Sequence, residues 1–75
     1  MDAETIRQYI LSGLPGAHVQ VHGEDGVHFK ANVVSDAFNG QSLLARHRMV
    51  YATLGDAMGA DIHALQLSTL TPSEA

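Results

Sequence analysis

The sequence contains no cysteine, which excludes two kinds of stabilising centre. No disulfide can form, and no metal site built only from thiolates is possible. The absence also suits a reducing compartment. With 75 residues the chain has room for a single domain, so we expect one domain over residues 1–75, stabilised by its apolar core.

Positive charge is also scarce, because four lysines and arginines stand against eight acidic residues, giving a net charge of −4. Such a chain repels nucleic acid as a whole, so phosphate binding would need a local basic patch. No apolar run approaches the roughly 20 residues that span a bilayer. The N-terminal segment MDAETIRQYI is acidic and has no signal-peptide core. We therefore expect a soluble cytoplasmic protein with no membrane association.

The common catalytic motifs are missing as well. The sequence has no Walker loop, no HExxH, no GxGxxG after a strand and no nucleophile elbow. No nucleophile stands beside a base in a recognisable arrangement. We therefore expect a protein that is not an enzyme.

The first segment predicts an amphipathic helix over residues 2–13. Asp2 is a suitable N-cap. Ile6, Ile10 and Leu14 repeat at intervals of four, which gives one apolar stripe. A glycine at the end of this range and a Pro-Gly pair just beyond it are typical of a helix end.

Residues 17–35 alternate apolar and polar side chains on both sides of the sequence GEDG, which predicts a β-hairpin. A two-residue turn would place apolar residues opposite polar ones. A three-residue loop over 24–26 pairs Val21 with Phe29 on the same face and ends in a glycine suited to a G1 bulge. This register places His22 opposite His28.

The second half predicts a helix, which Ser42 caps and Gly59 ends. Its apolar stripe consists of Leu43, Val50, Leu54 and Met58. A short helical turn is expected around Phe38, and residues 62–67 predict a third strand.

A helical connection between the second and third strands is long enough for a parallel crossover. The expected fold class is therefore α+β: two layers in the order αββααβ, with helices on one face of a three-stranded mixed sheet.

Histidine is abundant, with five residues in the chain: His18, His22, His28, His47 and His63. Neutral imidazole is the commonest nitrogen ligand for borderline metals. His22, His28 and His63 are expected at strand ends or on a solvated face, where a metal could reach them. His47 is expected to have a structural role, packed against the sheet or against the second helical element.

Arg46 and Arg48 flank His47 and could contact phosphate, although paired arginines on an acidic protein usually form a solvated helix face. The GxxG loop with which KH domains clamp a nucleic-acid backbone is missing, because the segment FNGQS has a single glycine.

The segment FNGQSLLARHRMVYATLGDAMGADIHALQLSTLTPSEA resembles the central signature of the BolA-like proteins. That signature is spread over many spaced positions, and the preceding HFKANVVSDAF matches too. The matching positions of the signature are Phe38, Gly40, Ser42, Arg46, His47, Arg48, Val50, Tyr51, Ile62, His63, Ala64, Leu65, Thr71 and Pro72.

This resemblance implies a fold like a class II KH domain and a partner, a monothiol glutaredoxin of the CGFS type. It further implies a [2Fe–2S] cluster shared with the glutaredoxin and glutathione, absent from the isolated protein. Within this chain, the resemblance makes His63 one cluster ligand. The second is His28, with His22 as the alternative.

The function implied is that of a non-enzymatic iron–sulfur trafficking or regulatory adaptor, a monomer alone and a heterodimer with glutaredoxin. Imidazole ligation raises the cluster potential, and protonation near the usual histidine pKa of about 6.5 would release the iron, so the cluster should be labile. The alternative is a DNA-binding transcriptional regulator acting in stress or morphology responses, in which Lys30, Arg46 and Arg48 contact phosphate.

Overall fold

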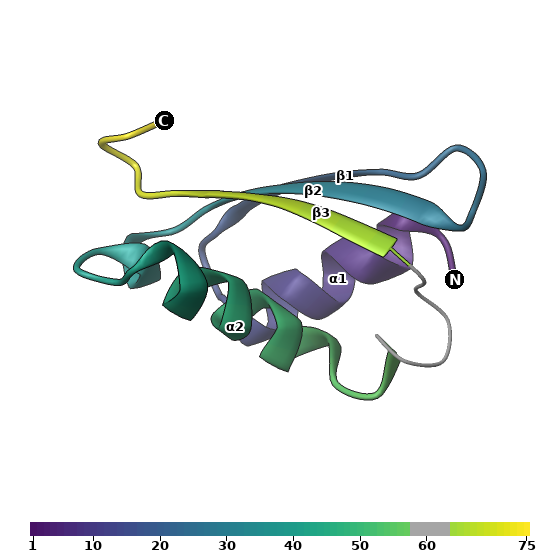
Figure 1. The fold of residues 1–75 in the computed structure, drawn as a ribbon, viewed down its shortest axis with the longest axis horizontal. Coiled ribbons are helices and arrows are strands. Elements are labelled where there is room, and N and C mark those ends of the chain that lie inside the picture. The colour runs from purple at the N-terminus through teal and green to yellow at the C-terminus, as the bar shows by residue number, and fades with distance from the viewer. Residues whose placement is uncertain (58–63) are drawn as a thin grey trace.

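The computed structural model describes residues 1–57 and 64–75, and these form two layers. Both helices lie on one side of the sheet, and the opposite sheet face is uncovered by any described element (Figure 1). The α+β fold class is confirmed. The elements in chain order are α1 (Ala3–Gly13), β1 (His18–His22), β2 (His28–Val34), the 3₁₀ helix η1 (Asp36–Phe38), α2 (Leu43–Leu54) and β3 (Ala64–Leu70).

Helix α1 forms as predicted. The Asp2 carboxylate accepts a hydrogen bond of 2.8 Å from the Thr5 backbone N–H, which satisfies one free donor of the first turn. Ile6 and Ile10 are completely buried, and Leu14 is nearly so. The stripe at intervals of four therefore faces the sheet.

The predicted hairpin register is wrong by two residues. Strands β1 and β2 are antiparallel, and His22 pairs with Lys30 rather than with His28. A shift of two residues keeps every side chain on its face, so the alternation is right and only the pairing changes. The loop spans five residues, from 23 to 27, because Asp25 holds a wider turn. Gly26 still has a positive φ of 72°.

Strand β3 pairs in parallel with β2, as predicted, and the sheet order is β1-β2-β3. The described strand continues three residues beyond the predicted end, to Leu70, and begins at Ala64. Ala64 is paired with His28, which brings the start of β3 to the hairpin end of the sheet. Ile62, the first residue of the predicted strand, lies outside the described residues.

Helix α2 starts at the predicted cap, where the Ser42 side chain accepts from the Ala45 N–H. It ends at Gly55 and not at Gly59, because Gly55 takes a φ of +55°, which glycine adopts without steric cost. Gly59 is outside the described part of the chain.

The predicted stripe of α2 is only partly buried. Val50 and Leu54 are buried in the core, whereas Leu43 is 64% exposed. The first turn of α2 extends past the end of α1 (Figure 1), and the next residue of that turn, Leu44, is exposed as well. Met58, the last residue of that stripe, is not among the described residues. The expected turn at Phe38 exists as η1, and Phe38 is completely buried.

Within residues 1–57 and 64–75, no helix combines the length and apolar character needed to cross a membrane.

Candidate metal centre

Two of the predicted ligands line one open depression at the hairpin end of the sheet. The depression has a volume of about 450 Å³, and its walls include His22, His28, Lys30 and Gln66 together with the hairpin loop. His22, Lys30 and Gln66 form one row across the three strands. The depression is therefore built on the outer face of the sheet, which the helices do not cover.

The orientation of His28 is set by Asp25. Asp25 Oδ2 lies 2.8 Å from His28 Nδ1, and Asp25 Oδ1 accepts from the backbone N–H groups of Val27 (2.9 Å) and His28 (2.8 Å). The His28 ring, followed by these N–H groups, holds the pKa of Asp25 below its usual value, so the carboxylate is ionised at neutral pH. A carboxylate bonded to one imidazole nitrogen is the common arrangement behind metal-ligating histidines.

His22 lines the same depression, but the structure does not place it directly opposite His28. Among the described residues, its ring has no hydrogen-bond partner. His63 lies outside the described residues. It directly precedes Ala64, which pairs with His28.

The described residues alone do not assemble a complete metal site, since no group of three or more histidine, cysteine, aspartate or glutamate side chains in them could hold an ion. What they offer is a single pre-oriented imidazole with a second imidazole nearby. Such a set suits a metal centre whose other ligands come from elsewhere.

The other two described histidines are remote from this depression. His18 is exposed at the opposite end of β1. His47 is half-buried on α2, and its Nε2 is buried with no hydrogen-bond partner in the part of the chain that the structure describes.

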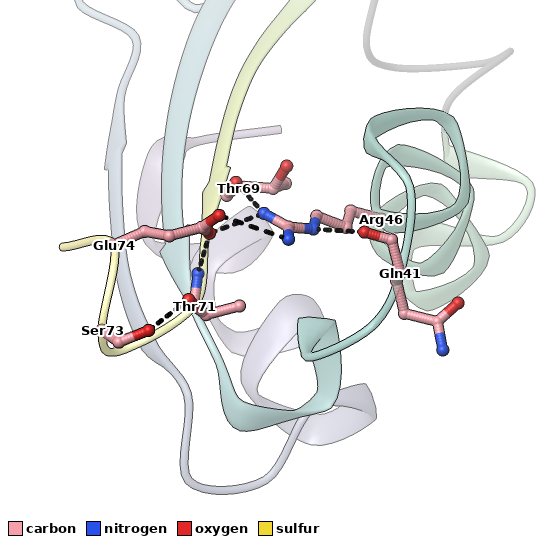
Figure 2. Close-up of polar contacts among 6 residues, drawn as sticks. All are labelled: Gln41, Arg46, Thr69, Thr71, Ser73 and Glu74. Atoms are coloured by element: carbon pink, nitrogen blue, oxygen red, sulfur yellow. Dashed lines mark hydrogen bonds and ion pairs between the residues drawn. The ribbon is translucent and has the colours of Figure 1, made fainter.

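Arg46 has a structural role that the sequence pattern did not reveal. Its side chain is only 13% exposed and donates to the Gln41 carbonyl at 2.9 Å, the Thr69 carbonyl at 3.2 Å and the Glu74 carboxylate at 2.7 Å (Figure 2). Its guanidinium also lies 6.0 Å from the centre of the Phe38 ring. Arg46 therefore joins α2 to β3 and to the C-terminal turn.

The Thr-Pro-Ser-Glu segment, residues 71–74, supplies the carboxylate that Arg46 contacts. Glu74 Oε1 accepts from the Thr71 backbone N–H at 2.7 Å, as in a capping box. The hydrogen bonds to Arg46, then to the Thr71 backbone, lower the pKa of Glu74 to about 2. The T-x-x-E spacing is the sequence signal that could have found this turn.

The three basic residues of the alternative expectation do not form one patch. Lys30 is exposed on the outer face of the sheet, whereas Arg48 is exposed on α2, which covers the opposite face. The Arg46 side chain is already hydrogen-bonded within the protein, to Gln41, Thr69 and Glu74 (Figure 2).

The chain is similar to known proteins over most of its length. The family model of BolA-like proteins matches residues 12–74. The chain is 49% identical over 47 residues to the DNA-binding transcriptional regulator BolA of Escherichia coli, covering 63% of this chain and 45% of that protein. It is 47% identical over 53 residues to SufE-like protein 1, chloroplastic/mitochondrial, of Arabidopsis thaliana, covering 69% of this chain and 14% of that protein.

The matched segment thus spans less than half the length of these curated relatives. Among solved structures, a bolA protein homologue from Coxiella burnetii superposes with a TM-score of 0.88 at 47% identity, covering 99% of this chain and 95% of that one. On the family match, the sequence identities and the shared fold, this chain belongs to the BolA-like protein family.

Proposed function

We propose that this protein is a non-enzymatic iron–sulfur trafficking or regulatory adaptor that binds a monothiol glutaredoxin and co-ligates a [2Fe–2S] cluster. From this chain, His28 and His63 are the proposed ligands, and glutathione and the glutaredoxin thiolate complete the set. The observation that carries the proposal is the His28 ring, which Asp25 holds on one side while the other ring nitrogen is without a described partner.

The residues present fit a cluster held between two proteins. The depression is open on the uncovered face of the sheet, so a second protein can approach it. The chain supplies imidazoles and no thiolates. Mixed imidazole and thiolate ligation gives a [2Fe–2S] cluster a higher reduction potential than thiolates alone.

The position of β3 supports His63 as the companion ligand. Ala64, the next residue in the sequence, pairs with His28. His22 remains the alternative second ligand because it lines the same depression.

The experiment mixes the protein with a monothiol glutaredoxin that carries its cluster and records visible circular dichroism. The wild type should change the spectrum, whereas His28→Ala and His63→Ala should each give a different or weaker change. His18→Ala is the matched control, because it removes an exposed imidazole from the far end of β1. An unchanged spectrum with wild type, or identical spectra for wild type and His63→Ala, would defeat the proposal.

A DNA-binding regulator is the second candidate, favoured by the match to the E. coli regulator. Lys30, Arg46 and Arg48 would contact phosphate, but Arg46 already donates to three oxygen partners within the protein. A gel-shift titration over salt concentration tests this candidate. If it holds, Lys30→Ala and Arg48→Ala should each lower the salt slope by roughly one unit. Absence of salt-sensitive binding would dispose of it.

A further inference from the structure

We infer that Asp25 is the positioning residue of the metal centre: it fixes the proton of His28 on Nδ1 and leaves Nε2 as the ligating atom. This inference rests on the proposed function and assigns a role to a residue that is not itself a ligand. It also selects between the two candidate second ligands.

The Asp25 carboxylate is held at both oxygens. Oδ1 accepts two backbone N–H groups, from Val27 and His28, and Oδ2 meets the His28 ring. The side chains of Asp25 and His28 are 54% and 72% exposed, so burial does not hold them in place. Three hydrogen bonds to one carboxylate therefore define the ring position.

The same contact determines the tautomer of His28. An ionised carboxylate can only accept hydrogen bonds, so Nδ1 has to donate. A neutral imidazole has a single N–H, and with that proton on Nδ1 the lone pair of Nε2 is available to a metal. In the part of the chain that is described, Nε2 has no hydrogen-bond partner.

His22 has no comparable anchor. It lines the same depression, yet none of the described side chains bonds to its ring. Neither its orientation nor its tautomer is preset. The geometry therefore favours His28 over His22 as the second ligand.

Replacing Asp25 by asparagine tests the tautomer without dismantling the loop. The Asn Oδ1 can keep the two backbone N–H bonds, which leaves the amide NH₂ where Oδ2 was. An NH₂ group donates, so Nδ1 of His28 must accept and the ring proton moves to Nε2. Asp25→Asn should thus reverse the tautomer. Glu24→Gln is the matched control, since it removes one negative charge from the adjacent loop position.

The first measurement is long-range ¹H–¹⁵N NMR on the isolated protein, with no cluster present, at a pH where His28 is neutral. Wild type and Glu24→Gln should show the His28 proton on Nδ1, and Asp25→Asn should show it on Nε2. A wild-type ring protonated on Nε2, or an Asp25→Asn ring like that of wild type, would overturn the inference.

The second measurement is cluster binding with the glutaredoxin, followed by circular dichroism. Changing the residue that orients a ligand typically weakens metal binding about 10–100-fold, so Asp25→Asn should lose affinity within this range. Adding it to His28→Ala should cause no further loss. If His28→Ala weakens binding and Asp25→Asn does not, the inference fails while the proposed function stands. If neither His28→Ala nor His63→Ala has an effect, the proposed function itself fails.

Discussion

At the scale of single residues, the hairpin end depends on how closely Phe29 approaches the loop. Phe29 is buried, and its ring packs directly over Gly23. A side chain at position 23 would occupy the space of the ring. The glycine is therefore required by packing, and it helps to set the wide loop that carries Asp25.

Replacing Gly23 by alanine should destabilise the fold, because its methyl group would overlap the Phe29 ring. Overpacking of this kind costs about 1–3 kcal/mol. Chemical denaturation measures the loss, with Glu24→Ala at the neighbouring exposed position as the control. A Gly23→Ala protein as stable as wild type would show that the loop does not depend on this contact.

Residue patterns predicted some of these features and missed others for physical reasons. Asp2 and the spacing of Ile6 and Ile10 predicted α1, because a cap and a periodic stripe are local signals. The role of Arg46 was missed, since its carboxylate partner is 28 positions away in the sequence. The orientation of His28 was also missed, because it depends on the loop conformation that Asp25 adopts.

At the scale of elements, the sequence pattern did not determine the β1–β2 register or the length of α2. The period of two in β1 and β2 predicted which side chains are buried, but pairings that differ by two residues bury the same side chains. The observed register goes with the five-residue loop, in which Asp25 accepts from the Val27 and His28 N–H groups. Two glycines could likewise end α2, and the backbone takes its positive φ at Gly55.

The C-terminal turn should respond to acid through Glu74. The pKa of Glu74 in the folded protein, about 2, lies below its ordinary value of 4.5, since Arg46 and the Thr71 N–H favour the ionised form. Its contribution to stability is therefore complete above pH 4.5 and is lost as the pH falls toward 2.

The measurement is the unfolding free energy of wild type and Glu74→Gln from pH 7 to pH 2. The difference between them should be largest above pH 5 and should shrink steadily below it. Glu24→Gln removes a carboxylate that is remote from Arg46 and serves as the control. A Glu74→Gln difference that does not vary with pH would contradict this assignment.

At the scale of the whole molecule, the two polar centres lie at opposite ends. The hairpin loop with Asp25 is at one end of the sheet, and the C-terminal turn with Glu74 is at the other (Figure 1). The first is open to solvent, while the second joins α2 to β3. Stability and the proposed metal binding should therefore be separable by mutation.

Arg46→Met tests this separation. It removes donors from the Gln41 and Thr69 carbonyls and from Glu74, so we expect a loss of about 1–3 kcal/mol in unfolding free energy. The folded variant should still change the visible circular dichroism of the glutaredoxin cluster as wild type does. A variant that keeps full stability, or one that folds and loses the spectral change, would show that the two ends are not independent.

The most direct measurement of cluster sharing is pulsed electron paramagnetic resonance on the reduced cluster in the complex, with ¹⁵N-histidine in this chain only. The account predicts ¹⁵N couplings from two imidazole ligands, one of which disappears in His28→Ala and the other in His63→Ala. A complex whose cluster shows no coupling to ¹⁵N from this chain would contradict it.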